Sequence, residues 1–350
     1  MPPRPPRKRL PPHPSSKPPS DRLSREQDQR WLAATARLAM RARPMCAPNP
    51  GVGAIIVGRN GRVIARGWTQ PGGRPHAEAM ALAAAAEAAR GATMYVSLEP
   101  CAHVSPRGPA CADLVAASGL ARVVVGGADP DPRTAGEGIA RIRAAGIAAE
   151  LIPCRTAEAS LEGYLMQRRH GRPHVTLKLA TSLDGCIALA SGESQWITGP
   201  QARAHTHAMR ARADAILVGG GTYRTDSPRL DVRLPGLESR SPQRWVLTRG
   251  AVGDDWHALP RPEAITQMSH VQNLFVEGGA GAAAAFLRAG LVDRLLLYRA
   301  PIIIGGGLPS IGDIGLESLA DAHGRWQFSS RCALGNDTLD IYEANPCSPA

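Results

Sequence analysis

Short apolar runs alternate with amphipathic helical segments along most of this 350-residue chain, and the alternation occurs in two blocks. The first block runs from about residue 52 to 151, and the second from about 174 to 343. Strands that alternate with helices predict an α/β fold with mainly parallel sheets covered on both faces. A chain of this length is expected to form roughly two domains, which agrees with the two blocks.

A helix over 24–43 is expected before the first block. Within the block we expect strands 52–57 and 63–65 as a hairpin, helix 77–90, strand 93–98, helix 112–118, strand 121–126, helix 135–145 and strand 148–151. In the second we expect strand 174–180, helix 200–212, strands 215–219, 244–247 and 273–277, helix 281–289, and strands 294–299 and 339–343. Composition changes around residues 155–173, where a connecting helix over 161–169 is expected. We therefore place the domains at 24–154 and 172–345, joined by a linker at 155–171.

The first twenty residues contain nine prolines and little that could form a core, so we expect a disordered tail over residues 1–23. They lack the apolar stretch of a secretory signal, and no run of about 18 apolar residues occurs anywhere in the chain. The formal net charge is +11, and residues 1–30 hold eight of the basic residues against three acidic ones. The rest of the chain also has more basic than acidic residues. Three explanations are open: binding of a phosphorylated substrate and cofactor, binding of nucleic acid, or a general preference for arginine.

The seven cysteines have irregular spacing and no export signal precedes them, which favours a cytoplasmic location. In a reducing compartment, cysteines near histidines are better interpreted as metal ligands than as disulfides. Five of them stand alone and are expected to be packing or surface residues: Cys46, Cys154, Cys186, Cys332 and Cys347.

The other two cysteines belong to a pattern typical of catalytic zinc. His76-Ala-Glu78 begins an expected helix, Pro100-Cys101 follows the next expected strand, and Cys111 begins the helix after it. One imidazole and two thiolates leave the fourth tetrahedral position open, and zinc lowers the pKa of bound water to about 7. Glu78 is expected to carry the water proton to the ring nitrogen and the leaving ammonia rather than to bind the metal.

This H-x-E and P-C pattern occurs in zinc nucleobase deaminases. Nine residues separate Cys101 from Cys111 here, against two in the nucleic-acid-editing type, so the substrate is expected to be a free pyrimidine and no nucleic-acid or membrane partner is expected. For His103, close to Cys101, substrate contact and a loop-packing role both stay open.

Six motifs in order resemble the RibD family of bifunctional riboflavin-biosynthesis proteins, over about residues 28–345. They are Ala47-Pro-Asn-Pro-Gly-Val-Gly53, Pro75-His-Ala-Glu78, Leu98-Glu-Pro-Cys-Ala-His103, Thr176-Leu-Lys-Leu-Ala-Thr-Ser-Leu-Asp-Gly185, Ser191-Gly-Glu-Ser-Gln-Trp-Ile-Thr198 and Glu277-Gly-Gly279. The resemblance implies an N-terminal cytidine-deaminase-like α/β/α domain followed by a dihydrofolate-reductase-like α/β domain.

The same resemblance implies two consecutive reactions. Zinc hydroxide would deaminate 2,5-diamino-6-ribosylamino-4(3H)-pyrimidinone 5′-phosphate, and NADPH would then reduce the ribosyl side chain to give 5-amino-6-ribitylaminouracil 5′-phosphate. One zinc ion and NADPH are therefore the expected cofactors. Three properties stay open: the oligomeric state, which includes the possibility of a homo-oligomer, the preference for NADPH over NADH, and the transfer of the intermediate between the two sites.

Site residues follow from the resemblance by motif position. Asn49 would hold the deaminase substrate. NADPH contacts would come from Ala180, Trp196, Thr222, Asp226 and the turn Gly279, Ala280 and Gly281, whereas substrate contacts in the reductase would come from Ser194, Arg210, Leu230, Arg233 and Glu277. We expect Lys178 and Asp184 near the reducing centre. The glycine-rich turns at 219–222 and 277–281 suit phosphate binding but are not a Rossmann fingerprint.

One loop departs from the family. RibD proteins usually have Gly-Lys/Arg-Thr-Pro-Pro-Cys before the second zinc cysteine, whereas this chain has Val104-Ser-Pro-Arg-Gly-Pro-Ala-Cys111, one residue longer. Arg107 is a candidate for the basic position.

Two other functions are compatible with part of the pattern. A deaminase of nucleic acid would use the tail as a basic arm, but the cysteine spacing and the second set of motifs oppose it. A non-catalytic, zinc-stabilised regulatory protein would not need the carboxylate of Glu78.

Overall fold

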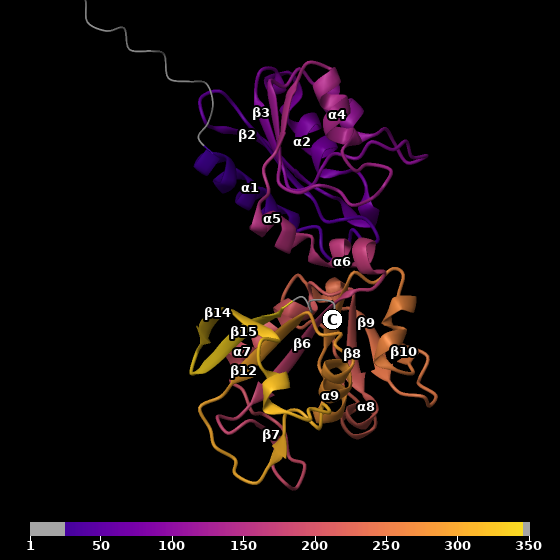
Figure 1. Ribbon diagram of the computed structural model, residues 1–350, viewed down its shortest axis with the longest axis vertical. Helices are drawn as coiled ribbons and strands as arrows, with labels where there is room; N and C mark the ends of the chain where they lie inside the picture. Colours follow the sequence, from indigo (N-terminus) through magenta and orange to yellow (C-terminus); the bar gives the residue numbers. More distant parts are fainter. Residues whose placement is uncertain (1–24, 346–350) are drawn as a thin grey trace, which may run out of the picture.

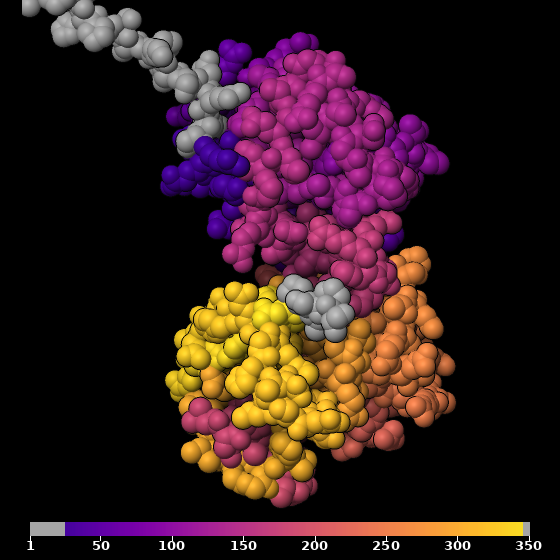
Figure 2. Space-filling view, viewed as in Figure 1, coloured from indigo at the N-terminus to yellow at the C-terminus, as the bar shows by residue number. Residues whose placement is uncertain are grey.

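The computed structural model describes residues 25–345, so the expected tail over 1–23 and Cys347 lie outside the described residues. Figure 1 shows two lobes stacked along the long axis, with α6 (Glu162–His170) at their junction. Figure 2 shows the same lobes meeting at a narrower waist. No helix among residues 25–345 is long and apolar enough to cross a membrane.

The upper lobe is built on a five-stranded sheet in the order β2-β1-β3-β4-β5. Its elements are α1 (Arg25–Ala39), β1 (Gly53–Val57), β2 (Val63–Trp68), η1 (Pro71–Gly73), α2 (Ala77–Ala85), η2 (Ala86–Ala89), β3 (Thr93–Val96), α3 (Cys111–Ala116), β4 (Arg122–Val125), α4 (Glu137–Ala144) and β5 (Ala148–Leu151).

Neighbouring residues of β1 belong to separate cores because successive side chains of a strand point to opposite faces. Ile56 packs with residues of α2, α3 and α4, whereas Ile55 packs with residues of α1 and α5 (Arg155–Ser160). The sheet is therefore covered on both faces, as predicted.

The sheet of this lobe is mixed, where a mainly parallel sheet was predicted. β1 pairs antiparallel with both β2 and β3 and runs opposite to the other four strands, whereas β3, β4 and β5 pair parallel with one another. The reversal comes from the hairpin turn, where Gly61 takes a left-handed φ of 75° and its amide bonds to the carbonyl of Gly58 at 2.9 Å.

Helix α1 ends four residues before the expected boundary at 43. Pro44 disfavours the helical region for the residue before it, and the chain instead passes through turns over residues 40–49. These turns carry Asn49 back toward the sheet, so the early end of the helix positions a predicted site residue.

The lower lobe is built on an eight-stranded sheet in the order β10-β9-β8-β11-β6-β12-β15-β14. Its elements are β6 (His174–Thr181), β7 (Cys186–Ala188), α7 (Pro200–Arg210), β8 (Ala215–Gly219), α8 (Gly220–Asp226), η3 (Glu238–Arg240), β9 (Gln243–Leu247), β10 (Trp256–Leu259), η4 (Pro262–Gln267), β11 (Asn273–Val276), α9 (Ala280–Arg288), β12 (Arg294–Arg299), β13 (Leu308–Pro309), η5 (Leu319–Ala322), β14 (Trp326–Leu334) and β15 (Asp337–Ala344).

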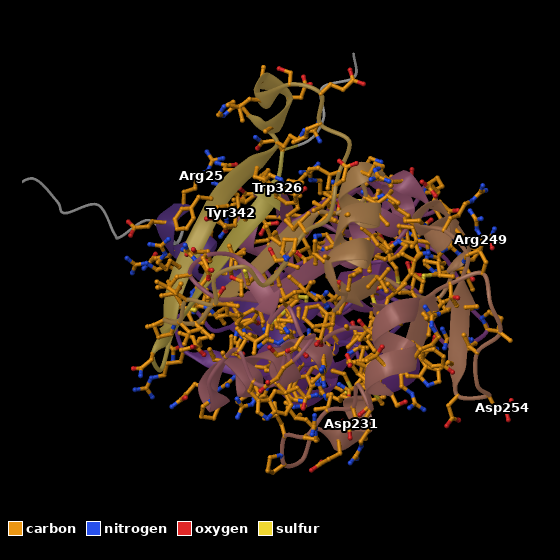
Figure 3. All side chains as sticks on the ribbon, turned by 90° about the horizontal axis from the view of Figure 1, so that it is seen from below. Arg25, Asp231, Arg249, Asp254, Trp326 and Tyr342 are labelled. Atoms are coloured by element: carbon orange, nitrogen blue, oxygen red, sulfur yellow. The ribbon has the colours of Figure 1, made fainter. Side chains whose placement is uncertain are left out.

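The sheet of the lower lobe is mainly parallel, as predicted. Strands from β10 to β12 run parallel, and only β15 and β14 pair antiparallel. Figure 3 shows the two ends of this sheet, with Trp326 and Tyr342 on the antiparallel pair and Arg249 and Asp254 near β9 and β10. A small sheet of β7 and β13 lies apart from it.

Helix α6 joins the lobes through close contact. A side chain at Gly163 would meet the side-chain amide of Asn273 at 2.6 Å, so only glycine lets this helix lie so near the start of β11. Next to it, Glu162 accepts two hydrogen bonds from Arg294, at 2.9 and 2.7 Å. The predicted linker is thus two helices, α5 and α6, of which α5 was not expected.

Candidate functional site

His76, Cys101 and Cys111 meet at one end of the upper sheet. His76 precedes the first residue of α2, Cys101 follows β3, and Cys111 begins α3. A side chain at Gly67 of β2 would collide with the carbonyl of Ala77, so the glycine lets the start of α2 lie directly on the strand. This close approach fixes His76 and Glu78 relative to the sheet.

The three side chains have the spacing that a tetrahedral metal needs. His76 Nδ1 lies 3.5 Å from Cys101 Sγ and 3.3 Å from Cys111 Sγ, and all ligand atoms lie within 4.8 Å of one another. Ligands bound to zinc at about 2.0 to 2.3 Å with tetrahedral angles lie roughly 3.3 to 3.8 Å apart. Within residues 25–345 this is the one such group of potential ligands, and it fits zinc.

The two thiols differ in acidity. Hydrogen bonding from Cys111 and then from His76 lowers the pKa of Cys101 to about 3. The same interaction, together with burial, raises the pKa of Cys111. The two thiols thus share one proton readily, and a bound cation would stabilise both as thiolates.

Glu78 lies beside the thiols and is only 3% exposed. Burial raises the pKa of its carboxyl to about 7, and this effect exceeds the opposing influence of His76. A carboxyl with a pKa near neutrality can both accept and return a proton, which is the property that a general acid–base residue requires.

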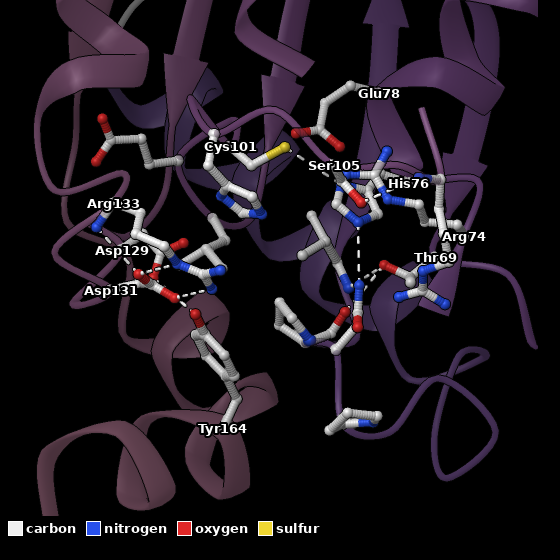
Figure 4. A pocket seen from close by; sticks show the side chains of 18 of the residues that line it. Thr69, Arg74, His76, Glu78, Cys101, Ser105, Asp129, Asp131, Arg133 and Tyr164 are labelled. Carbon is white, nitrogen blue, oxygen red and sulfur yellow. Dashed lines mark hydrogen bonds and ion pairs between the residues drawn. The ribbon is translucent and has the colours of Figure 1, made fainter. Parts of the chain in front are cut away.

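A cavity of about 290 Å³ opens in front of this cluster (Figure 4). Asn49 lines it, with Nδ2 3.0 Å from the carbonyl of Gly73 and 3.1 Å from His76 Nε2. His103 lines it too, and its buried Nδ1 has no hydrogen-bond partner within the protein. A buried ring nitrogen without a partner is a candidate contact for a polar ligand.

A second cavity, of about 650 Å³, lies in the lower lobe around the carboxyl ends of β6, β8 and β11. Of the residues predicted to bind cofactor or substrate there, the structure brings these to its wall: Lys178, Ala180, Ser194, Trp196, Arg210, Thr222, Asp226, Arg233, Glu277 and Gly279. Helices α8 and α9 both begin at this cavity, so their unpaired amide groups lie where a phosphate could bind.

Four other predicted residues do not line this cavity. Ala280 and Gly281 lie in the first turn of α9, just behind Gly279. Leu230 is buried in a hydrophobic cluster with Tyr298 and Phe275. Asp184 accepts hydrogen bonds from the amides of Ile304 and Gly305, at 3.1 and 2.8 Å.

Three charged side chains interact at the base of the second cavity. Glu277 accepts a bidentate pair from Arg210 at 2.6 and 3.0 Å, and Lys178 Nζ lies 3.9 Å from it. Burial lowers the pKa of Lys178, although the charge of Glu277 opposes this. For Glu277 burial alone would raise the pKa, but hydrogen bonding and charge from Arg210 lower it. Glu277 is therefore ionised beside the guanidinium of Arg210.

Residues 25–127 match the family described as "Cytidine and deoxycytidylate deaminase zinc-binding region", and residues 173–259 and 262–339 match "RibD C-terminal domain". The chain is 38% identical to riboflavin biosynthesis protein RibD of Escherichia coli (strain K12), across 85% of this chain and 94% of that protein. It is 40% identical to RibD of Mycobacterium tuberculosis (strain H37Rv), across 83% and 90%. The chain belongs to the RibD family.

Solved RibD structures match both lobes. Acinetobacter baumannii RibD, form 2, has a TM-score of 0.81 at 32% identity and covers 91% of this chain and 99% of its own. The Thermotoga maritima diaminohydroxyphosphoribosylaminopyrimidine deaminase/5-amino-6-(5-phosphoribosylamino)uracil reductase has a TM-score of 0.80 at 28% identity, with coverage of 91% and 99%. As a RibD protein, this chain is a bifunctional deaminase and reductase of riboflavin biosynthesis, as predicted.

The loop that departs from the usual RibD pattern folds back over the first cavity. Ser105 and Gly108 form a β-bridge, and Arg107 donates to the carbonyl of Gly72 at 2.9 Å. Arg74 donates to the carbonyl of Pro109 at 3.2 Å. Both arginines line the cavity, and the hydrogen bonds recorded for their side chains go to neutral carbonyls, so their charges face it without a carboxylate partner there.

The residues on the opposite wall of the first cavity were not predicted from the sequence. Arg133 donates to both carboxylate oxygens of Asp131, Arg168 of α6 lies 3.7 Å from the same carboxylate, and Tyr164 donates to Asp129 at 2.8 Å (Figure 4). The run Asp129-Pro-Asp131-Pro-Arg133 follows β4, and polar residues after a parallel strand are a usable signal. For Tyr164 and Arg168 no such signal exists, since their contacts depend on where α6 docks.

Proposed function

We propose that the upper lobe deaminates 2,5-diamino-6-ribosylamino-4(3H)-pyrimidinone 5′-phosphate and that the lower lobe reduces the ribosyl chain of the product with NADPH. The observation that carries the first half is the metal-sized group of His76, Cys101 and Cys111 beside the buried carboxyl of Glu78. Its cavity has the size of a single small molecule, which suits a free nucleotide-like substrate better than a nucleic-acid strand.

In the deaminase site, His76, Cys101 and Cys111 would hold zinc, which supplies Lewis-acid activation of a water molecule. Glu78 would take one proton from that water and give it to the ring nitrogen. It would then pass a second proton, from the hydroxyl formed on the ring carbon, to the departing amine. Its high pKa supports this role, because the carboxyl must be deprotonated in one step and protonated in the next.

Substrate contacts in this site would come from three sides. Asn49 presents its amide beside His76, and His103 offers its unpartnered Nδ1. Arg107 and Arg74 supply positive charge for the 5′-phosphate, and guanidinium groups match phosphate geometry. Arg107 would thus take the place of the basic residue in the usual family loop.

In the reductase site, NADPH would lie along Ala180, Trp196, Thr222, Asp226 and the turn Gly279, Ala280 and Gly281, and it supplies the hydride. The substrate would be held by Ser194, Arg210, Arg233 and Glu277, which line the cavity, whereas Leu230 is buried outside the cavity wall. Lys178 lies on the cavity wall beside ionised Glu277, where its amine can donate hydrogen bonds to polar groups of the ribosyl chain, and Asp184 would order the neighbouring loop.

We also propose that the protein works in the cytoplasm. The six cysteines within residues 25–345 are free thiols, which is typical of proteins from a reducing compartment and supports this proposal.

Removal of the metal tests the assignment of the two reactions to separate sites. Chelation should abolish ammonia release from the diaminopyrimidine phosphate, since zinc activates the water, and added zinc should restore it. The same sample should still oxidise NADPH when supplied with the deaminated pyrimidine. Loss of NADPH oxidation on chelation, or ammonia release without metal, would contradict the proposal.

A further inference from the structure

The loop that carries Asn49 lies between the two lobes. On one side Asn49 points into the deaminase cavity, with its amide beside Gly73 and His76. On the other side the backbone meets the reductase lobe, where the side-chain amide of Gln272 donates to the carbonyls of Pro48 at 2.8 Å and Asn49 at 3.2 Å. A residue of the lower lobe therefore holds the backbone of a substrate-binding residue of the upper lobe.

Gln272 is itself fixed in place. It directly precedes β11 and is 5% exposed. Its amide hydrogen is donated to Asp214 at 3.1 Å, and its carbonyl accepts from the amide of His174 at 2.8 Å. Two residues at the ends of neighbouring strands thus hold the backbone of Gln272. Its side chain is therefore a rigid support for the loop.

Further contacts from the lower lobe reach the same loop at its other end. Arg240 donates to the carbonyls of Arg43 at 2.8 Å and Arg41 at 3.2 Å, and Arg43 in turn donates to the side chain of Asn273. These contacts hold residues that do not line the deaminase cavity. Among the contacts between the lobes within residues 25–345, that of Gln272 is the one that reaches Asn49 itself.

We propose that Gln272 is a positioning residue for deamination, which sets the place of Asn49 in the deaminase cavity from within the reductase lobe. Gln272 does not line that cavity and touches no reacting atom, so it acts through Asn49. The inference rests on the proposed role of Asn49 in holding the substrate. It makes the reductase lobe a structural part of the deaminase site.

Gln272 is also remote from the chemistry of its own lobe. Glu277 and Gly279 line the reductase cavity beyond the carboxyl end of β11, whereas Gln272 precedes the amino end of that strand. A change confined to the Gln272 side chain should therefore spare reduction. The two activities of one chain then serve as test and internal control.

The first test replaces Gln272 in the full-length zinc-loaded protein. Gln272→Met keeps the length of the side chain but removes both hydrogen bonds, so KM for deamination should rise about five- to tenfold while kcat changes less than about twofold. Reduction of the deaminated pyrimidine should be unchanged, which also shows that the variant is folded. Gln272→Glu, which cannot donate to the two carbonyls, should reproduce the effect.

A matched control exists in the same interface. Gln167 of α6 also donates its side-chain amide to a backbone carbonyl of the lower lobe, that of Ser269 at 3.0 Å, but does not touch the Asn49 loop. Gln167→Met should leave KM for deamination unchanged. An equal rise of KM in both variants would mean that the loss of any contact between the lobes weakens substrate binding, and would overturn the role of Gln272.

A double-mutant cycle tests whether the effect passes through Asn49. Asn49→Ala should raise KM for deamination, and adding Gln272→Met to it should cause no further rise, because the residue to be positioned is gone. If Asn49→Ala has no effect, the proposed role of Asn49 fails and this inference fails with it. If Asn49→Ala raises KM but Gln272→Met alone does not, or the two effects multiply, only the role of Gln272 is overturned.

Discussion

Among the buried carboxylates of the deaminase lobe, Glu78 is the one that faces the thiol cluster. Glu99 accepts hydrogen bonds from the amides of Gly136 and Ile139, and Asp129 accepts one from Tyr164, so both are engaged in structural contacts. Glu78 instead interacts with Cys111 and His76. Its proton is therefore available for chemistry.

Replacing Glu78 tests its role as the proton carrier. Glu78→Gln keeps the shape of the side chain but cannot exchange a proton, so kcat for ammonia release should fall by about 10²- to 10⁴-fold. Zinc content and NADPH-dependent reduction should be unchanged. Glu87→Gln is the matched control, since Glu87 is exposed and pairs with Arg90 at 2.7 Å on the surface. Full deaminase activity in Glu78→Gln would contradict the role of Glu78 as the proton carrier.

A second residue-scale prediction concerns phosphate binding in the reductase cavity. Arg233 lines the cavity and is half exposed, with a loose ion pair to Asp231 at 3.3 Å. Arg233→Gln should raise KM for the deaminated substrate about tenfold, with little change in stability, because a charge-assisted contact to phosphate is lost. Arg229 pairs with the same Asp231 but does not line the cavity, so Arg229→Gln should leave KM unchanged. Equal KM values for the two variants would contradict the assignment.

At the scale of residues, the sequence predicted those site residues that belong to local sequence motifs. His76, Cys101 and Cys111 converge as expected because each follows or begins an element of one sheet. Gln272 could not have been predicted, since nothing around it indicates contact with a loop more than 220 residues earlier in the chain.

At the scale of elements, helix α6 links the two lobes through charge. Glu162 receives two hydrogen bonds from Arg294, and Arg43 and His174 lie 3.6 and 3.9 Å away. Burial by itself would raise the pKa of Glu162, but its neighbours His174, Arg294 and Arg43 outweigh this effect and lower the pKa to about 2. Burial lowers the pKa of His174 itself, so the two arginines are the lasting cationic partners. The ionised carboxylate therefore stabilises the junction.

The low pKa of Glu162 determines the direction in which the stability of the protein depends on pH. Because the folded pKa lies below the ordinary value of 4.5, the stabilisation is complete above pH 4.5 and is lost as the pH falls toward 2. Glu162→Gln should lower the free energy of unfolding by about 3 kcal/mol at pH 7, and the difference from wild type should shrink as the pH falls below 4.5. Urea denaturation at several pH values measures it. A deficit that does not depend on pH would contradict the ion-pair explanation.

Glu158 provides the control for this helix pair. It lies on α5, is exposed and pairs with Arg169 at 3.4 Å. Glu158→Gln should change stability by less than about 0.5 kcal/mol at every pH, because exposed pairs are screened by solvent.

Elements with strong apolar patterns were predicted closely, and exposed ones were not. The bounds of β8 and β12 match the expected ranges. β14 was missed because nearly all of its residues are exposed, so no alternation of apolar and polar residues marks it. Helix α5 was interpreted as linker because it is short and its composition is polar.

At the scale of the whole molecule, two α/β lobes each carry one cavity, and the junction contributes to one of them. The two-lobe organisation followed from the two blocks of alternation in the sequence. The junction did not, because Gly163, Gln272 and Arg240 acquire their roles only when the lobes dock. Tyr164 and Arg168 of α6 complete the deaminase cavity, so that cavity includes part of the linker.

The central claim is that one chain carries out both reactions in sequence, deamination before reduction. The most direct measurement incubates the purified protein with 2,5-diamino-6-ribosylamino-4(3H)-pyrimidinone 5′-phosphate, with and without NADPH, and identifies the products by mass. Without NADPH the product should show only replacement of an amine by oxygen, and with NADPH it should also gain two hydrogens. A product that has gained hydrogens but kept its amine, or an unchanged substrate under both conditions, would contradict the claim.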